Sequence, residues 1–367
     1  MRTFLLEDFY EKHEFSTRYL LSQSDCESMT VDELLALEPG ASDQLHNLWL
    51  GYTEVKGSLH LRERISALYQ NCGPDDILVH AGAEEAIYGF MQTVLERGDH
   101  MVYLSPAYQS LYEVAASAGC EVSPWRLRQG QDGWTLDMEE LVSLIKPQTK
   151  LIVINTPHNP TGYALSDMQL KRIADIARER GLLVLGDQVY KGLERDGQPH
   201  VWMSDIYENA VSLGVMSKAY GLPGLRIGWI ATRNKDVYEK MLRLKYYTTI
   251  CCSAPSEYLS ALALAHSDAL LQRSVNIIRD NIALSEGFFE KYKDVFVNNT
   301  PAAGPVAFHK LKNGRDAGAF CEDLIEKSGV LLLPGYVYET DGSYFRMGYG
   351  RKNFGECLTA LDEHLQK

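Results

Sequence analysis

The sequence contains no apolar run that approaches the roughly twenty residues needed to cross a bilayer. Near the N-terminus, Glu7 and Asp8 interrupt the apolar stretch too soon for a signal peptide. We therefore expect a cytoplasmic protein that does not bind membranes. Internal repeats, low-complexity tracts and flexible linkers are also lacking.

Basic residues are scarce, since 36 Lys and Arg stand against 49 Asp and Glu, for a formal net charge of −13. Nucleic acids attract basic surfaces, so this balance disfavours a nucleic-acid partner. The cysteines are odd in number and show no metal-ligand spacing, which indicates free thiols in a reducing compartment and no metal site. They are Cys26, Cys72, Cys120, Cys251, Cys252, Cys321 and Cys357.

With 367 residues, 45% of them hydrophobic, the chain can bury a large core, and its length favours two domains. Strand-like runs alternate with helical stretches, a pattern typical of an α/β sheet covered by helices on both faces. The predicted strands lie near residues 77–80, 101–104, 151–155, 182–187, 211–215 and 227–232, and the predicted helices near residues 84–97, 108–118 and 166–180.

Lys218 lies in the glycine-rich run of residues 216–229, the most informative stretch of the chain. A lysine acts as a nucleophile when burial or nearby positive charge favours its neutral amine. Arg226 would supply such charge, and the glycines of the run let the backbone approach a ligand closely. A surface lysine in a turn between two strands is the plain alternative.

Polar side chains follow two predicted strands at the point where each strand ends. Asn159 lies in the rigid turn after the apolar strand 151–155, while Asp187 ends the next strand and Tyr190 comes three residues later. Ligands bind at the carboxyl edge of open α/β sheets, so we expect these three side chains to meet there. Taken singly, they are also compatible with a plain turn, a capping aspartate and a packing aromatic.

Residues 79–86 are typical of a strand end, a turn of small residues and the start of a helix. The backbone N–H groups of Gly82, Ala83 and Glu84 would then point at an anion, helped by the helix dipole. Alternatively, Glu84 and its neighbour Glu85 only favour a helix start.

With this set of segments the chain resembles the class I aminotransferases, which are pyridoxal phosphate (PLP) enzymes of fold type I. The resemblance runs from about residue 45 to the C-terminus, and the order of Asn159, Asp187, Lys218 and Arg226 carries it. Any one of these residues alone would be a weak signal.

The resemblance implies an α/β fold of two domains. The large PLP-binding domain, residues 45–250, would hold a mixed, mostly parallel sheet covered by helices. Residues 1–44 and 251–367 would form a smaller α+β domain, whose motion closes the site over the substrate.

The resemblance also implies a role for each residue at the sheet edge. Lys218 would carry PLP as a Schiff base and shuttle a proton at the substrate α-carbon. Asp187 would pair with the pyridine nitrogen and so make the ring an electron sink. Asn159 and Tyr190 would hydrogen-bond the phenolic oxygen of the ring, and Tyr190 counts with Lys218 and Asp187 as catalytic.

Further contacts to the cofactor follow from the resemblance. Besides the turn at 82–84, Arg226 would pair with the phosphate and Ser217 would donate its hydroxyl. Val215 stands where related enzymes often carry a second serine, so we expect one phosphate contact to be missing or replaced. Tyr108 matches the aromatic that stacks on the ring, with core packing as its alternative.

Tyr52 matches a tyrosine that reaches the phosphate of the neighbouring subunit in this family. If that role carries over, the enzyme is a homodimer with shared active sites. A tyrosine on a surface loop is the alternative reading.

Arg346 matches the arginine whose planar fork binds the substrate α-carboxylate, and Asn159 is placed at the substrate with it. Arg351 lies close by in the sequence. Arg346 is preferred because it lies on an alternating strand pattern, whereas Arg351 follows a glycine at a predicted turn.

The leading functional prediction is an aminotransferase that moves an amino group between an L-amino acid and a 2-oxo acid. Residues 6–9, 106–111 and 217–226 also resemble capreomycidine synthases, fold type I enzymes that cyclise a hydroxylated arginine without transferring its amino group. Elimination or cyclisation of an amino acid is therefore the alternative. A third reading, a non-catalytic aminotransferase-like regulator, is disfavoured by the presence of Lys218 and Asp187.

Overall fold

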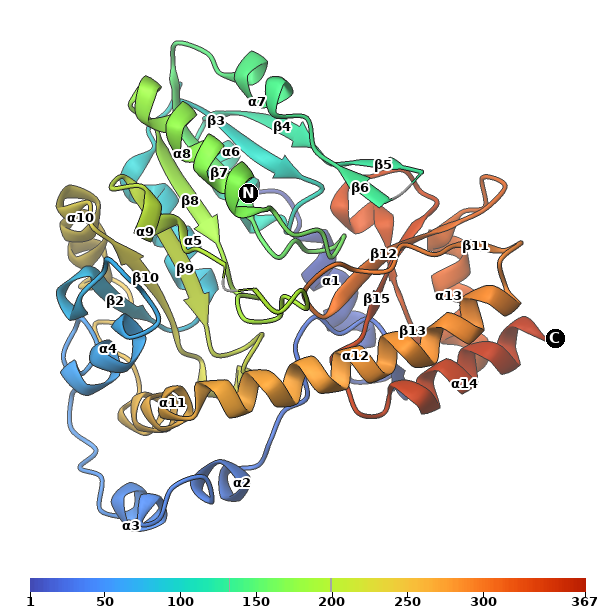
Figure 1. Ribbon diagram of the computed structural model, residues 1–367, viewed down its shortest axis with the longest axis horizontal. Helices are drawn as coiled ribbons and strands as arrows, with labels where there is room; N and C mark the ends of the chain where they lie inside the picture. Colours follow the sequence, from blue (N-terminus) through green and yellow to red (C-terminus); the bar gives the residue numbers. More distant parts are fainter. Residues whose placement is uncertain (132, 199) are drawn as a thin grey trace.

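The computed structural model describes residues 1–131, 133–198 and 200–367. The strands of its largest sheet are β2 Ile77–His80, β3 His100–Ser105, β4 Glu121–Arg126, β7 Thr149–Asn155, β8 Leu183–Asp187, β9 Ala210–Val215 and β10 Gly228–Thr232. Their order is β2-β10-β9-β8-β7-β3-β4 (Figure 1). Strands β9, β8, β7, β3 and β4 pair in parallel, and β10 is antiparallel to both of its neighbours. The sheet is thus mixed and mostly parallel, as predicted.

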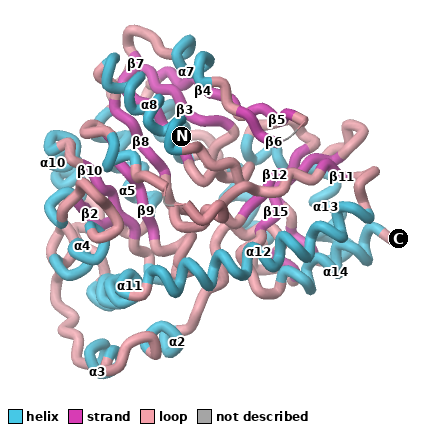
Figure 2. The backbone as a smooth tube through the Cα atoms, viewed as in Figure 1, coloured by secondary structure: helices cyan, strands magenta, loops and turns pink. Residues whose placement is uncertain are grey.

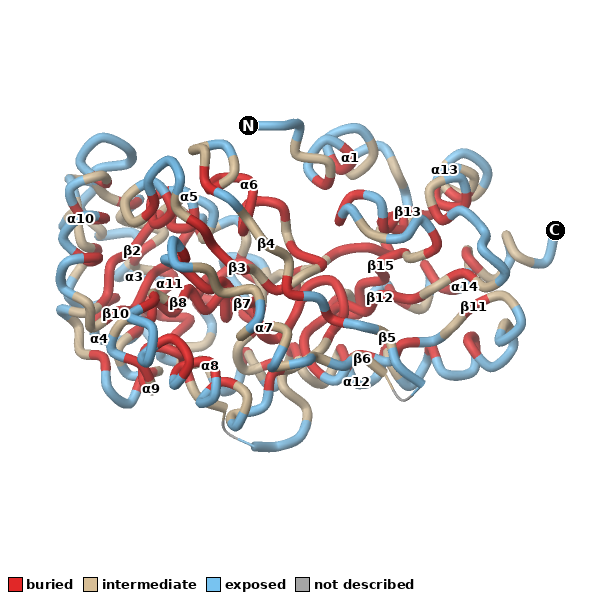
Figure 3. Tube along the Cα trace, turned by 90° about the horizontal axis from the view of Figure 1, so that it is seen from above, coloured by how far each residue is buried: buried red, intermediate tan, exposed pale blue. Residues whose placement is uncertain are grey.

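The helices that pack on this sheet are α5 Ala83–Val94, α6 Ser110–Ser117, α7 Met138–Leu144, α8 Asp167–Arg180, α9 Met203–Ile206 and α10 Lys235–Lys245. Side chains alternate between the two faces of a sheet along each strand. In β7, Leu151 and Val153 pack in a cluster with α5, α6 and α10, whereas Ile152 and Ile154 pack with α7, α8 and α9. The apolar run of β7 is therefore a strand covered on both faces, and Figure 3 shows it buried.

A second sheet is built from the C-terminal third of the chain. Its strands are β11 Phe296–Val297, β12 Val306–Leu311, β14 Leu333–Pro334 and β15 Tyr344–Gly348, in the antiparallel order β11-β12-β15-β14. Helices α13 Ala317–Ser328 and α14 Phe354–Leu365 lie beside it, and Figure 2 shows its strands apart from the large sheet. This sheet and its helices form a smaller α+β part of the molecule.

The N-terminal segment belongs to this smaller part through a short strand pair. Strand β1 Tyr19–Leu20 pairs in parallel with β13 Val330–Leu331, and the N–H of Gly348 donates to the carbonyl of Leu21 at 2.8 Å. Helix α1 Leu5–His13 precedes β1 and packs in a cluster with Phe308 and Val337.

Helix α12 Ser267–Lys291 runs beside both parts of the molecule (Figure 1). Helix α11 Ala254–Ala265 packs against α4 Leu59–Ser66 and α2 Val31–Leu35. The domain boundaries at residues 44 and 250 stay a prediction. The remaining elements are α3 Ala41–His46, the hairpin β5 Arg128–Gly130 and β6 Gly133–Thr135, and 3₁₀ helices at Pro74–Asp76, Pro223–Leu225 and Gly335–Tyr338. In the part of the chain described, we find no helix with the length and apolarity of a membrane span.

Candidate active site

A cavity of about 410 Å³ opens at the carboxyl ends of three neighbouring strands. Asn155, Asp187 and Val215, the last residues of β7, β8 and β9, all line it. Most of the predicted site residues line the same cavity. They are Ala83, Glu84, Tyr108, Asn159, Asp187, Tyr190, Ser217, Lys218, Arg226 and Arg346.

Lys218 lies just beyond the end of β9, and its side chain lines the cavity. Its Nζ donates to Oγ of Ser24 at 3.0 Å, and its carbonyl accepts from the N–H of Cys26 at 3.2 Å. The segment 24–26 is therefore fastened to the lysine through both backbone and side chain. Lys218 lies in the turn between β9 and β10, as its alternative reading had it, but it is half-buried and lines the cavity.

Asp187 is buried at the end of β8, where its Oδ1 accepts from the N–H of Val189 at 3.3 Å. Burial raises the pKa of this carboxyl from 3.8 to about 7. No Lys, Arg or His of the residues described lies within ion-pair distance of it, although the charge of Lys218 partly offsets the effect of burial on the pKa. A buried carboxylate with no direct ion pair fits the protonated nitrogen of a pyridinium ring, which would compensate its charge.

The raised pKa of Asp187 predicts a pH-dependent stability of the cofactor-free protein. Below about pH 4 the carboxyl is neutral in both states, and above that pH the unfolded chain releases the proton first. Folding is therefore progressively disfavoured between about pH 4 and pH 7. We expect the thermal midpoint to fall more over this range in the wild type than in Asp187→Asn, whose amide does not titrate. Equal declines in the two proteins would contradict the raised pKa.

The turn after β7 is held by Asn155, which the sequence analysis did not single out. Its Oδ1 accepts from the N–H of Asn159 at 2.7 Å, and its Nδ2 donates to the carbonyl of Asp187 at 3.1 Å. Oδ1 of Asn159 in turn accepts from the Tyr338 hydroxyl at 2.8 Å and from Nη1 of Arg346 at 3.1 Å. Asn159 thus joins the strand end to Arg346.

Arg346, on β15, is 1% exposed and lines the cavity. Its Nη2 donates to the Tyr10 hydroxyl at 2.6 Å and to the carbonyl of Ser22 at 2.8 Å. Arg351 instead pairs with Asp25, at 2.6 Å between Nη2 and Oδ2, and does not line the cavity. Of the two arginines, Arg346 is therefore the one at the site.

The turn before α5 holds Arg226 closely. Gly82 has a φ of +93°, and a Cβ there would lie 2.6 Å from Nη2 of Arg226. The N–H of Gly82 donates to the carbonyl of His80 at 2.8 Å, so it does not point at an anion as predicted. The N–H groups of Ala83 and Glu84, at the start of the helix, remain available.

The predicted aromatic residues have different positions. Tyr108 lines the cavity, and its hydroxyl donates to Oε1 of Glu7 at 2.8 Å, while its ring also packs against two hydrophobic clusters. Tyr190 is buried at the cavity wall, and burial raises the pKa of its hydroxyl. Tyr52 does not line the cavity and is 88% exposed. Its neighbours Trp49 and Leu50 are also largely exposed.

Helix α1 forms a wall of the cavity that the sequence analysis did not predict. Glu7, Tyr10 and Glu14 are spaced by three and four residues, which places them on one helical face, and all three line the cavity. The spacing was visible in the sequence. The sequence did not show that this helical face lines the cavity, because that depends on how α1 packs near β15.

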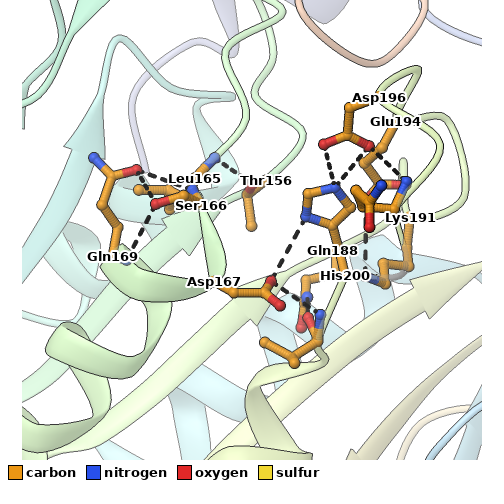
Figure 4. A network of polar contacts seen from close by, with 12 residues as sticks. Thr156, Leu165, Ser166, Asp167, Gln169, Gln188, Lys191, Glu194, Asp196 and His200 are labelled. Carbon is orange, nitrogen blue, oxygen red and sulfur yellow. Dashed lines mark hydrogen bonds and ion pairs between the residues drawn. The ribbon is translucent and has the colours of Figure 1, made fainter.

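Lys191, a second lysine near Asp187 in the sequence, lies outside the cavity. Nζ of Lys191 lies 3.8 Å from Oε1 of Glu194, in the polar network of Figure 4. In the same network, His200 lies 2.9 Å from Oδ2 of Asp196 and 3.6 Å from Oδ1 of Asp167. Lys191 therefore belongs to a cluster that fastens the loop after β8 to the start of α8.

Comparison with known proteins places this architecture in a family. Residues 19–357 match the family model described as aminotransferase class I and II. Capreomycidine synthase of Streptomyces vinaceus is 30% identical, over 98% of this chain and 93% of that protein. A probable aspartate aminotransferase of Methanocaldococcus jannaschii is 26% identical, over 82% of this chain and 81% of that protein.

Solved structures agree with this result. A PLP-dependent aminotransferase from Streptococcus suis superimposes with a TM-score of 0.93 at 32% identity, over 100% of this chain and 98% of the other. The PLP-dependent cyclase OrfR gives a TM-score of 0.91 at 26% identity, over 100% and 97%. The chain therefore belongs to the class I and II aminotransferase family and has the fold type I architecture of PLP-dependent enzymes.

Proposed function

We propose that this protein is a PLP-dependent aminotransferase that moves an amino group between an L-amino acid and a 2-oxo acid, with Lys218 as its central catalytic residue. The observation that carries the proposal is the convergence of Lys218, the buried carboxylate of Asp187 and the buried Arg346 on one cavity. These groups supply a movable proton, a partner for a ring nitrogen and a carboxylate receptor.

The residues of the cavity suit the parts of the cofactor. When bound, PLP supplies an electron sink for the charge that develops at the substrate α-carbon. Asp187 would keep the ring nitrogen protonated, and Tyr108 would lie against the ring face. Tyr190 and the amide nitrogen of Asn159 would donate to the ring oxygen. At the other end, Arg226 with Ser217 and the first N–H groups of α5 would hold the phosphate.

Lys218 would move the proton at the substrate α-carbon. Its Nζ is kept in the cavity by a hydrogen bond to Oγ of Ser24, an uncharged acceptor. Arg346 would fix the α-carboxylate, and Asn159, bonded to that arginine, would stand between substrate and ring. Water is restricted on this side because α1 covers the cavity wall.

We further propose that the substrate side chain is cationic. Glu7, Glu14 and Glu84 line the cavity, and each accepts a hydrogen bond only from an uncharged group. The cationic side chains of the lining, Lys218, Arg226 and Arg346, all have roles already. Among the residues described, no further cation lines the cavity to receive a second carboxylate, so dicarboxylic substrates are disfavoured.

A second candidate reaction is elimination or cyclisation without amino transfer. It is supported by the similarity to capreomycidine synthase along 98% of the chain and by the likeness to the cyclase OrfR. The lack of a cation for the second carboxylate of a dicarboxylic acceptor favours it as well. The residues that would hold the cofactor are shared by both reactions, so products must distinguish them.

The test is a single-turnover spectral titration of the PLP-loaded protein with a panel of L-amino acids. We expect lysine, ornithine or arginine to convert the protein to its pyridoxamine form and release a 2-oxo acid, while aspartate leaves it unchanged. A return to the starting spectrum without pyridoxamine would replace transamination with elimination or cyclisation. Conversion by aspartate alone would contradict the cationic side chain.

The carboxylates of α1 can be tested separately. Glu14→Gln should raise KM for a cationic substrate about tenfold or more, the effect of losing roughly 1.4 kcal/mol of charge-assisted contact, and leave cofactor absorbance unchanged. Glu11 lies on the same helix, is exposed and does not line the cavity, so Glu11→Gln is the matched control. Equal KM values in the two variants would remove Glu14 from the substrate site.

We also propose that the protein is a homodimer with shared active sites. Trp49, Leu50, Tyr52, Tyr247 and Ile250 expose between 48% and 89% of their surface, and such apolar patches mark interaction sites. The two segments that carry them are joined, because the Thr53 hydroxyl donates to the carbonyl of Cys252 at 3.1 Å. A second copy would cover this face and bring Tyr52 toward a phosphate site that has no second serine.

A further inference from the structure

Glu85, in the first turn of α5, links the turn of Gly82 to a distant surface segment. Its Oε2 accepts from the N–H of Ala81 at 2.6 Å. Its Oε1 accepts from the hydroxyls of Thr248 at 2.8 Å and Thr249 at 2.7 Å. The Glu85 side chain is 16% exposed. One carboxylate thus fastens the turn on which Arg226 packs to the segment that follows α10.

The segment after α10 is held in an unusual backbone conformation. Ile250 has a φ of +61°, a region that β-branched residues rarely adopt. Its N–H donates to the carbonyl of Lys245 at 3.0 Å. Lys245 is 1% exposed, and its Nζ donates to Oγ1 of Thr249 at 2.7 Å. The position of this segment therefore depends on the buried polar contacts beneath it.

The same polar contacts extend to the segment that carries Tyr52. The Thr53 hydroxyl donates to Oε1 of Glu257 at 2.9 Å, and Oε2 of Glu257 accepts from the N–H of Ser58 at 2.8 Å. Glu257 is 2% exposed. The two sets meet at Cys252, because Nζ of Lys245 lies 4.0 Å from its Sγ and the Thr53 hydroxyl donates to its carbonyl. Polar contacts therefore run from the turn at Gly82 to the backbone of the two segments that carry the exposed face.

We propose that Glu85 is a positioning residue that couples cofactor binding to subunit association. This inference rests on the proposed function, because it takes the phosphate to bind at the turn of Gly82 and a second copy to cover the exposed face. A partner subunit that packs on residues 246–250 would fix the positions of Thr248 and Thr249. Through their hydrogen bonds to Glu85, it would also fix the position of the turn at Ala81. By linkage, the factor by which PLP tightens the dimer equals the factor by which dimerisation tightens PLP binding.

The test measures that factor in the full-length protein. Sedimentation velocity gives the dimer dissociation constant with and without saturating PLP, for the wild type and for Glu85→Gln. The glutamine keeps the size of the side chain but replaces one accepting oxygen with a donating NH₂. We expect PLP to tighten the wild-type dimer by roughly tenfold. In Glu85→Gln the factor should fall to the smaller part that direct contact of Tyr52 of the second copy with the phosphate supplies.

Two further variants separate coupling from general damage to the fold. Thr248→Val with Thr249→Val removes only the surface side of the link and should lower the factor as far as Glu85→Gln does. Glu96→Gln, at an exposed position just past α5, should keep the wild-type factor. If Glu85→Gln does not fold, the threonine pair decides the matter, because α5 and the bond to Ala81 stay intact.

The outcomes distinguish this inference from the proposals beneath it. If PLP tightens the dimer by the wild-type factor in both Glu85→Gln and the double-valine variant, the coupling through Glu85 is overturned. The proposals of a homodimer and of PLP binding would then still stand. A wild type that binds PLP as a monomer would overturn both coupling and homodimer, but not the role of Lys218. A wild type without PLP absorbance would overturn the proposed function itself.

Discussion

Lys218→Ala is expected to abolish turnover, with a loss of roughly 10³-fold or more, because among the residues described no other amine lines the cavity where the proton must be moved. The visible absorbance that PLP shows when linked to a lysine should disappear at the same time. Absorbance spectra of the purified variant with added PLP, together with product formation from the best amino acid of the panel, provide the measurement.

Lys191→Ala is the matched control, because Lys191 is the other lysine near Asp187 in sequence and lies outside the cavity. Its absorbance should equal that of the wild type. If Lys218→Ala kept the absorbance and Lys191→Ala lost it, the assignment of the cofactor-bearing lysine would move to Lys191. If both kept it, a lysine-linked cofactor would be refuted altogether.

Arg346→Ala is expected to raise KM for the amino acid by about 10- to 150-fold, the equivalent of roughly 1.5–3 kcal/mol for a lost charge-assisted contact. The substitution also leaves the Tyr10 hydroxyl and Oδ1 of Asn159 without their cationic donor. PLP absorbance should change far less than KM, because Arg346 lies on β15, away from the phosphate-side turn. Steady-state kinetics and a PLP titration of the same preparation give both values.

Arg351→Ala controls for a general loss of positive charge near the site. Arg351 pairs with Asp25 and does not line the cavity, so its removal should change KM little. A normal KM in Arg346→Ala combined with a raised KM in Arg351→Ala would transfer the carboxylate site to Arg351.

The central strands and the polar residues that end them were predictable from local sequence. Strands β7 and β8 are buried on both faces and therefore read as continuous apolar runs, and Asn159 and Asp187 follow directly from the ends of those runs. Strand β4 was not predicted. It is the edge strand of the sheet and contains Pro124 amid partly exposed residues, so it lacks such a run.

Contacts that depend on distant segments were not predictable. Ser24 meets Lys218 across 194 positions of sequence, and Tyr10 meets Arg346 across 336. Both contacts exist because β1 pairs with β13, an arrangement that no local pattern records. The prediction that the N–H of Gly82 points at an anion was wrong for a local reason, because this N–H donates to the carbonyl of His80.

The pairing of β1 with β13 has a consequence for synthesis on the ribosome. Residues 1–25 are made long before their partners in β13 and β15. At about 5–20 residues per second, the earlier segment waits roughly 15–65 seconds for them. During that time Leu6, Phe9 and Tyr10, which are buried in the finished protein, remain exposed to chaperones. The cavity therefore cannot close before β15 has been made.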